Sequence, residues 1–357
     1  MKDKIKKLEF PLVIILGAII LINLILISII NIEYSNKISE AKEASRPAEI
    51  ELITINPVCT DCFDINKVID TLKSKNVKIT KETTLTKDES KDLIDKYKIT
   101  KLPSLIVKGE IDKFDLGLTK KDDVLIFNEP QPPYLDLISN KVEGRVSLTL
   151  ITDPTCTECT DLGVIVDQLK QLITISSENT LTKDQASDLI QKYSITKIPS
   201  IILSKDASVY PTISEDWKQI GTIEIDGTFI ARDINPPYLD LTTNEIKGIV
   251  DVIYITDKSC SECYNATVHK QILDNFGIYV NKEETRDIAD STALISKYNI
   301  DKVPTLILSK EVSAYPRLTA VWKDVGTVEE DGTYIFRKTE VMGVSKDLKT
   351  NSLIKQS

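Results

Sequence analysis

The chain has 357 residues, of which 41% are hydrophobic and 28% are charged, and its formal net charge at pH 7 is −9. This composition is too apolar for a disordered chain and too charged for a membrane protein with many spans, and the length suffices for two or three domains. The net negative charge repels phosphate backbones and argues against nucleic acid as a partner.

The N-terminus reads as a basic tail followed by an apolar segment. Residues 1–10 hold four lysines against two acidic residues, and the 22 residues of 11–32 hold no charge. A helix of this length crosses the hydrocarbon core, which is ~30 Å thick. Because positively charged flanks stay inside, we expect residues 1–10 to be a cytoplasmic tail and residues 11–32 to be a transmembrane helix. The chain from Glu33 onward then lies on the extracytoplasmic side of the cell membrane.

A cleaved secretory signal is the alternative interpretation of this segment. Signal peptides have shorter apolar regions that end in a small-x-small cleavage site. The sequence Glu33-Tyr34-Ser35-Asn36-Lys37 contains no such site. We therefore expect a retained signal-anchor, and in both cases the body of the protein is exported. Residues 33–47 are polar and are expected to form a short stalk.

The body contains one unit of about a hundred residues repeated three times. Each copy has an apolar run, a Cys-x-x-Cys pair and a later segment in which an aliphatic residue precedes Pro103, Pro199 or Pro304. From the first cysteine to this proline the separation is 44, 43 and 44 residues. Agreement over so long a span indicates true repeats. The expected domains are residues 48–145, 146–249 and 250–344, followed by a C-terminal tail of residues 345–357.

Local patterns give the expected order of elements within a unit. The apolar run before the cysteines is typical of a buried strand, and we expect the Cys-x-x-Cys pair at the start of a helix. A short strand, a second helix and a proline-led strand follow. Asp226-Gly227 and Asp331-Gly332 then lie between two apolar runs, which indicates a β-hairpin. The order predicts an α/β fold with a central mixed sheet flanked by helices.

A second phrase, Pro-Pro-Tyr-Leu-Asp-Leu, recurs at residues 132–137 and 236–241 and does not recur after the third unit. A stiff proline-rich connector between domains is one interpretation. A clamp, in which the tyrosine and leucine dock one domain on the next, is the other. The missing third copy fits both.

The cysteine pairs are the candidate reactive groups. Two cysteines three residues apart at a helix start place both sulfurs on one turn, near the positive end of the helix dipole. This environment favours the thiolate, which is the nucleophile, and the second cysteine can attack a mixed disulfide made by the first. The candidate catalytic residues are Cys59, Cys62, Cys156, Cys159, Cys260 and Cys263.

This combination of strand, Cys-x-x-Cys, helix, aliphatic-proline segment and hairpin resembles the thioredoxin superfamily in each of the three units. The resemblance implies that the prolines are cis, that they lie beside the cysteines, and that the residue before each proline pairs with the substrate chain. It also implies that the first cysteine of each pair attacks and the second resolves. The substrate-binding residues would then be Leu102, Pro103, Ile198, Pro199, Val303 and Pro304.

Several features depart from the family pattern. The Trp-Cys-Gly-Pro-Cys sequence is missing, and an acidic residue, Asp61, Glu158 or Glu262, precedes the second cysteine of each pair. A nearby negative charge disfavours the thiolate and opposes the helix dipole. The buried acid expected six residues before the first cysteine is replaced by Ile53, Leu150 and Tyr254.

Two functional classes remain open. Several such domains in series resemble the multidomain disulfide isomerases, which implies a membrane-anchored thiol–disulfide oxidoreductase acting on thiols and disulfides of exported proteins, with a separate redox partner to recharge the sites. The alternative is a redox-inert binding or spacer protein with structural disulfides. A four-thiolate metal site needs two pairs brought together, and these pairs lie in separate units, so we expect no metal and no cofactor. The single histidine, His269, is expected to have no functional role.

Overall fold

The computed structural model describes the backbone of residues 2–355 and the side chains of residue 17 and residues 20–355. The side chains of the expected tail, residues 1–10, lie outside this described part, as do those of residues 11–16, 18 and 19. The chain divides into two compact units, one up to Glu143 and one from Gly144 onward. Each is described by itself below.

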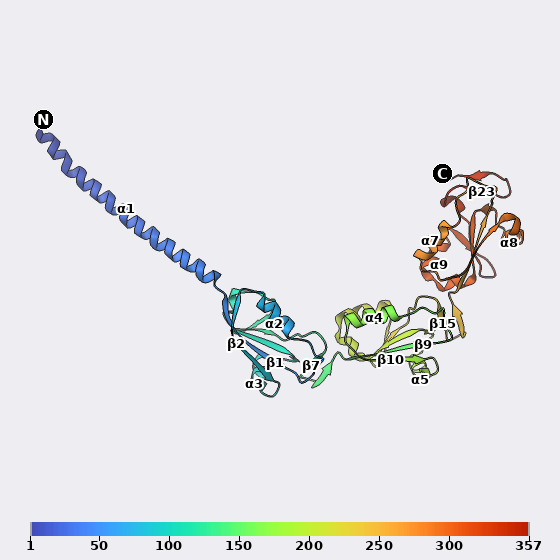
Figure 1. Cartoon of the computed structure of the whole chain (residues 1–357), viewed down its shortest axis with the longest axis horizontal. Coiled ribbons are helices and arrows are strands. Elements are labelled where there is room, and N and C mark those ends of the chain that lie inside the picture. The colour runs from blue at the N-terminus through green and yellow to red at the C-terminus, as the bar shows by residue number, and fades with distance from the viewer. Residues whose placement is uncertain (1, 356–357) are drawn as a thin grey trace. The chain divides into compact units, whose positions relative to one another are not determined.

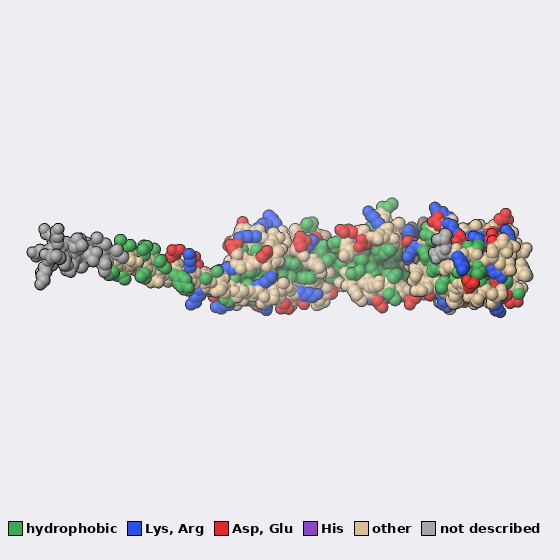
Figure 2. Space-filling model, turned by 90° about the horizontal axis from the view of Figure 1, so that it is seen from above, with side chains coloured by type: hydrophobic (Ala, Val, Ile, Leu, Met, Phe, Trp, Pro, Cys, Tyr) green, Lys and Arg blue, Asp and Glu red, His purple; other side chains and the backbone are tan. Residues whose placement is uncertain are grey.

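The N-terminal helix α1 (Lys2–Ser45) is longer than the sequence predicts (Figure 1). It continues without a break through residues 33–45, so most of the expected stalk of residues 33–47 is helical. Its described part, Ile20–Ser45, is long and apolar enough to cross a membrane. Apolar side chains dominate the described helix next to the grey atoms, and charged side chains appear on it nearer the first repeat (Figure 2). This composition supports a single N-terminal anchor.

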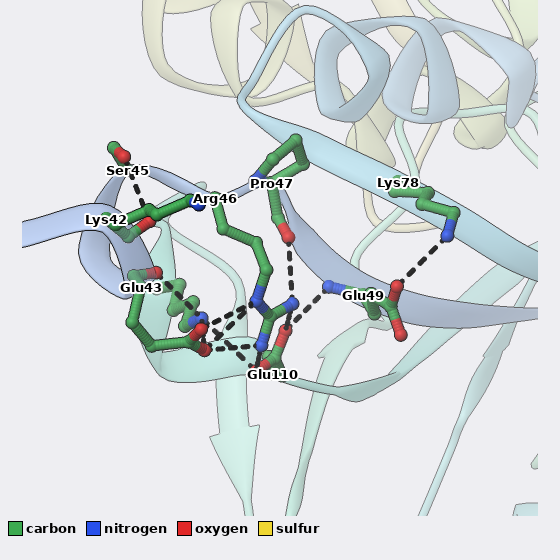
Figure 3. A network of polar contacts seen from close by, with 9 residues as sticks. Lys42, Glu43, Ser45, Arg46, Pro47, Glu49, Lys78 and Glu110 are labelled. Atoms are coloured by element: carbon green, nitrogen blue, oxygen red, sulfur yellow. Dashed lines mark hydrogen bonds and ion pairs between the residues drawn. The ribbon is translucent and has the colours of Figure 1, made fainter. Parts of the chain in front are cut away.

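A cluster of charged residues joins the end of α1 to the first repeat (Figure 3). The guanidinium of Arg46 contacts the carboxylate of Glu43 at 2.6 Å and that of Glu110 at 2.5 Å. Lys113 lies 3.0 Å from Glu43 and 3.2 Å from Glu110. Glu110 also accepts the backbone N–H of Glu49 at 2.9 Å, in the first strand of the sheet. The hydrogen bond from Arg46 lowers the pKa of Glu110 to about 2.

Each repeat is built on a mixed sheet of five strands in the described part of the chain, which confirms the predicted fold class. The strand that precedes the cysteines pairs in parallel with the next long strand, and the remaining pairs are antiparallel. The first sheet has the order β2 (Val77–Thr86), β1 (Ala48–Asn56), β4 (Ser104–Gly109), β6 (Val124–Phe127) and β5 (Thr119–Lys121). The second has the order β10 (Ile175–Thr182), β9 (Val146–Thr152), β12 (Ser200–Leu203), β14 (Phe229–Ala231) and β13 (Gly221–Ile223). The third has the order β18 (Val280–Asp287), β17 (Val250–Thr256), β20 (Thr305–Leu308), β22 (Tyr334–Phe336) and β21 (Gly326–Val328).

Helices cover both faces of each sheet, because alternate residues of the central strand enter two separate cores. One face carries α2 (Asn66–Lys73), α4 (Gly163–Leu172) or α7 (Val268–Asn275), joined in the later repeats by α6 (Pro211–Asp216) or α9 (Pro316–Trp322). The other carries α3 (Lys91–Tyr97), α5 (Ser187–Lys192) or α8 (Thr292–Lys297). Short 3-10 turns complete the repeats: η1 (Ile111–Lys113), η2 (Lys205–Val209), η3 (Trp217–Gln219), η4 (Ile288–Asp290), η5 (Lys310–Ala314) and η6 (Thr339–Val341).

A small three-stranded sheet accompanies each repeat. A two-residue strand just before the proline pairs with a hairpin that follows the main sheet, and we call this hairpin the strap. The three sheets are β3 (Lys101–Leu102) with strap β7 (Tyr134–Asp136) and β8 (Lys141–Glu143), β11 (Lys197–Ile198) with strap β15 (Tyr238–Asp240) and β16 (Glu245–Lys247), and β19 (Lys302–Val303) with strap β23 (Ser345–Asp347) and β24 (Leu353–Ile354).

The straps correct two sequence-based interpretations. The Pro-Pro-Tyr-Leu-Asp-Leu phrases are neither free connectors nor clamps on the next domain, because their last residues form the first strap strand within their own repeat. Residues 345–354, expected to belong to a C-terminal tail, form the third strap. The signal for it was a shorter phrase, Asp-Leu-x-Ser/Thr-Asn, which recurs at Asp136, Asp240 and Asp347. In each copy the aspartate accepts backbone N–H groups of the turn.

Candidate functional site

All three cysteine pairs form disulfides within their Cys-x-x-Cys segments. The Cα atoms are 5.5 Å apart for Cys59–Cys62 and 5.4 Å apart for both Cys156–Cys159 and Cys260–Cys263. Each pair lies in the loop that follows β1, β9 or β17, the second strand in the order of its sheet, before the helix on the first face. The folding of the strand and helix therefore brings the two sulfurs to one end of the sheet.

The prediction that each pair opens a helix is wrong. Helix α2 begins at Asn66, four residues after Cys62, and the other two pairs are separated from α4 and α7 in the same way. The amides of Cys156 and Cys260 instead donate to the carbonyls of Asp153 and Asp257 in tight turns. Since the field of a helix dipole falls off within its first turn, it gives these sulfurs less support than a position inside the helix would.

The sheet register places each predicted proline opposite the end of the strand that precedes its cysteines, at the same end of the sheet. The peptide bonds before Pro103, Pro199 and Pro304 are cis, as are those between the paired prolines Pro132-Pro133 and Pro236-Pro237. In the third repeat the hydroxyl of Tyr264, the residue after the second cysteine, donates to the carbonyl of Pro304 at 2.8 Å. The loop after the disulfide and the proline are thus in direct contact.

The strap lies against the same loop in every repeat. The backbone N–H of the residue after the second cysteine donates to a strap-side carbonyl at 2.8 Å. The three pairs are Phe63 to Pro133, Thr160 to Pro237 and Tyr264 to Val344. Sequence reasoning missed this contact because it joins residues that are 70 to 80 positions apart and carries no side-chain signal.

The residues predicted to face a substrate chain face the strap instead. Leu102 is opposite Leu135, Ile198 is opposite Leu239, and Val303 is opposite Lys346. The side chains of Leu102, Ile198 and Val303 are fully buried in the core of the second face. The described structure therefore places the cysteines and prolines at the same end of each sheet and covers the strand edge before each proline.

These shared features decide the fold of the repeats: a strand, a Cys-x-x-Cys disulfide and a helix in chain order, and a cis-proline at the same end of a mixed sheet. The three repeats are thioredoxin-like domains. Their strap and their acidic Cys-x-x-Cys segments are the departures from that pattern.

Comparisons with known proteins add little beyond this assignment. No protein-family model matches the chain, and no curated protein matches it. Among solved structures, the alkylhydroperoxide reductase component AhpF from Enterococcus faecalis is 16% identical, with 46% of this chain and 81% of that chain covered and a TM-score of 0.16. Human ERp44 is 10% identical, with 84% and 94% covered and a TM-score of 0.14. Full-length ERdj5 is 12% identical, with 75% and 40% covered and a TM-score of 0.14.

The third thioredoxin-like domain has a buried hydrogen-bond chain that the first two lack. His269 Nε2 lies 3.1 Å from the Tyr264 hydroxyl, which donates its one hydrogen to Pro304. His269 must therefore donate to Tyr264 from Nε2. Burial lowers the pKa of His269 to about 4 and raises the pKa of Tyr264. The histidine expected to have no role thus supports the residue beside Cys263.

Two domains also hold a buried acid three residues before the first cysteine, which sequence reasoning did not single out. Asp257 is paired with Lys346 at 2.6 Å, and Asp153 with Lys183 at 3.2 Å. The hydrogen bond from Lys346 is the main cause that lowers the pKa of Asp257. In the first domain Asn56 takes this position. The recurring Ile-Thr-Asp phrase before the second and third pairs was the available signal.

The surroundings of the second disulfide form a hollow. It has a volume of about 440 Å³ and is lined by Cys159, Glu158, Asp161, Pro237 and Tyr279, among others. Cys156 is only 8% exposed and does not line it. The accessible sulfur of this pair is therefore that of Cys159.

Within the described residues, no group of three or more histidine, cysteine or acidic side chains could hold a metal ion. The disulfides also occupy the sulfurs that a thiolate site would need. The chemistry open to the site in this state is exchange at sulfur.

Proposed function

We propose that the chain is a membrane-anchored thiol–disulfide oxidoreductase of the extracytoplasmic space. The observation that carries this proposal is that each disulfide closes a loop of only four residues at the same end of the sheet as a cis-proline, in all three domains. A bond in this place joins no two distant elements of the fold.

Loop entropy separates this role from a structural one. In the chain-entropy model a disulfide stabilises by about 2 kcal/mol when it closes four residues and by about 4.7 kcal/mol when it closes 100. A protein selected for disulfide staples gains most by linking separate elements, and these pairs link neighbours in one turn. Neighbouring sulfurs are what two-step exchange requires, because the second thiolate must reach the mixed disulfide on the first.

The proposed reaction transfers two electrons between a dithiol and a substrate disulfide. One cysteine thiolate attacks a substrate sulfur, a mixed disulfide forms, and the other substrate sulfur leaves as a thiolate that takes up a proton. The partner cysteine then attacks the mixed disulfide, restores the intramolecular bond and releases the second substrate thiol. The family resemblance assigns attack to Cys59, Cys156 and Cys260 and resolution to Cys62, Cys159 and Cys263.

The proposed location follows from helix α1 and from the cysteines. An N-terminal apolar helix with lysines before it leaves the domains outside the cytoplasm, where disulfides persist. Exchange that is repeated needs a separate dithiol or disulfide partner to reset the sites. The domains would act on thiols and disulfides of exported molecules.

Redox titration of the full chain in detergent tests the proposal. We expect each pair to pass between dithiol and disulfide in graded thiol–disulfide buffers, as counted by mass after alkylation. We also expect Cys→Ser variants of the resolving position to trap mixed disulfides. Three pairs that stay oxidised in strong reductant, with no trapped adduct at either cysteine, would instead establish the redox-inert binding or spacer protein. The acid in each pair is the observation that favours this second candidate, because it opposes thiolate formation.

A further inference from the structure

The strap changes which substrates can approach the sulfurs. The amide of Leu137 donates to the carbonyl of Thr100 at 2.8 Å, so these two residues form a hydrogen-bonded pair of the antiparallel ladder. Such pairs alternate along a ladder, and the next one joins Leu102 to Leu135. The backbone N–H and C=O groups of the residue before the proline are therefore both hydrogen-bonded to the strap. Leu241 with Thr196, and Leu348 with Asp301, repeat the arrangement at 2.8 Å.

The strap is fixed on three sides. Its leucines Leu135 and Leu137 pack on the core of the second face, as do Leu239 and Leu241 in the next domain. Its proline carbonyl accepts the amide after the second cysteine, and its turn is closed by an aspartate. An extended polypeptide that paired with the strand beside the proline would have to displace all of these contacts.

The hollow at the second disulfide has the size and charge to select a ligand. A volume of about 440 Å³ is in the range of small-molecule sites. Glu158 and Asp161 are in its lining, and no described lining residue carries a positive charge. An anionic molecule would meet repulsion at this sulfur, and a cationic one would meet attraction.

We propose that the substrates of these sites are low-molecular-weight thiols and disulfides that reach the sulfur end-on, with cationic ones preferred over anionic ones at the second site. This substrate class rests on the proposed oxidoreductase function. The strap excludes strand pairing by a polypeptide, and the acidic hollow sets the charge preference. Entry at the second site is at Cys159, because its partner Cys156 is buried. At this site the proposal therefore reverses the assignment implied by the family resemblance, in which Cys156 attacks and Cys159 resolves.

The exchange balances as follows for cysteamine, a small cationic thiol. A cysteamine thiolate attacks the sulfur of Cys159, a mixed disulfide forms there, and Cys156 leaves as a thiolate that takes up a proton. A second cysteamine thiolate attacks the sulfur of the bound cysteamine. Cystamine, the disulfide of cysteamine, departs, and Cys159 takes up a proton. In reverse, the reduced pair reduces cystamine.

The test uses the full chain in detergent, with the first and third pairs changed to serine so that only the second reacts. The probes are cystamine, glutathione disulfide and an unfolded polypeptide with one disulfide. We expect the rate constant for cystamine to exceed that for anionic glutathione disulfide about tenfold at low salt and less at high salt. We expect the polypeptide to be the slowest. Mass mapping should find the trapped cysteamine on Cys159.

A substitution of Glu158 tests whether the preference for cystamine comes from the charge of the hollow or from the reactivity of the thiol. Glu158→Gln should lower the ratio of the cystamine rate constant to the glutathione disulfide rate constant. Since both probes meet the same sulfur, a change in thiolate fraction cancels in this ratio. An unchanged ratio, or equal rates for the two probes in the parent chain, overturns the charge preference.

The strap is tested by Leu239→Pro, which removes a ladder hydrogen bond of the second strap. The matched control is Leu135→Pro, the same change in the first domain, which leaves the second strap intact. Leu239→Pro should raise the polypeptide rate constant severalfold and leave the cystamine rate constant within about twofold, because the residues that line the hollow are unchanged. The change also removes a buried leucine from the core of the second face, so the variant is less stable than the parent chain. A parent chain that reduces the polypeptide as fast as cystamine overturns the proposal.

Hydrogen exchange of the parent chain keeps the test decisive where the variant does not fold. The amides of Ile198 and Leu239 should stay protected while a polypeptide substrate reacts. Loss of their protection shows that the strap opens for polypeptides and overturns the proposal. If the reduced pair reacts with none of the three probes, the oxidoreductase function itself is contradicted. This outcome differs from the ones that overturn the substrate class.

Discussion

The hydroxyl of Tyr264 donates a hydrogen bond to the carbonyl of Pro304 across 2.8 Å. It joins the loop that holds Cys263 to the proline segment that passes beside it, and His269 supports the tyrosine from the following helix. The first domain has Phe63 at this position and the second has Thr160. The third site therefore has a side-chain hydrogen bond to its proline segment that Phe63 cannot form in the first site.

Tyr264→Phe should remove this tie without changing the shape of the side chain. We expect the free energy of unfolding of the third domain to fall by about 1 kcal/mol, the usual net value of one hydrogen bond. The measurement is denaturant unfolding followed by hydrogen exchange of α7 and β20. Phe63→Tyr is the control in the first domain, where no histidine follows to complete the chain. An equal loss in both variants would contradict the specific role of Pro304.

Acid should destabilise the third domain through His269. Its pKa is lowered from 6.5 to about 4 by burial, so the unfolded chain binds the proton more readily than the folded one. The stability present above pH 6.5 is therefore lost as the pH falls toward 4, by roughly 3 kcal/mol at most. His269→Gln, which retains a donor for Tyr264, should flatten this dependence. If the free energies of unfolding of parent and variant fall equally between pH 7 and 4, His269 does not cause the loss of stability in acid.

The buried pair of Asp257 and Lys346 should show strong coupling. Lys346 takes the position at which the other two straps have Leu135 and Leu239, and Asn56 replaces the aspartate in the first domain. Lys346→Leu alone leaves a buried carboxylate without its cation and should cost about 3 kcal/mol of stability in the third domain.

The double variant of Lys346→Leu with Asp257→Asn copies the first domain and should recover most of that loss. The comparison of the single and double variants by denaturant unfolding is a double-mutant cycle, which isolates the pairwise energy. Additive losses would mean that the two side chains act independently of each other.

The charged cluster at the end of α1 should control how firmly the helix joins the first domain. Glu110→Gln removes one of the two carboxylates that Arg46 and Lys113 share, and should speed hydrogen exchange of the Glu49 amide, whose hydrogen bond Glu110 accepts. Lys78→Gln, which breaks an exposed ion pair with Glu49, is the control and should have little effect. Because the pKa of Glu110 is lowered to about 2, its contribution is complete above pH 4.5 and is lost as the pH falls from there toward 2. Protection of Glu49 that is unchanged at pH 2 would contradict this role.

The sequence was sufficient for the repeat and the sheet, because these depend on local patterns that recur at fixed spacing. It was insufficient for the straps, because the pairing of Leu102 with Leu135 is a backbone contact between distant residues. The third strap was missed because its first strand lacks the proline pair and the tyrosine, although Asp347 and Asn351 keep the turn.

The position of the cysteines relative to the helices could not be read either, because a few loop residues between them do not change the apolar periodicity. The same holds for residues 33–45: their polar composition suits an exposed helix as well as an irregular stalk. The acids Asp153 and Asp257 were visible in the sequence, but only the folded chain shows that they are buried and paired with lysines.

The continuous helix α1 has a consequence for what the anchored sites can sense. If the bilayer ends near Ile32, residues 33–45 extend the helix by about 20 Å before the first sheet begins. This distance is about twice the Debye length at physiological salt, so the charge of lipid headgroups is screened along it. A helical spacer keeps the domains at this distance, whereas a flexible segment would allow the acidic domains to move closer to the membrane surface or farther from it. The sites would then respond to soluble molecules and not to the lipid composition beneath them.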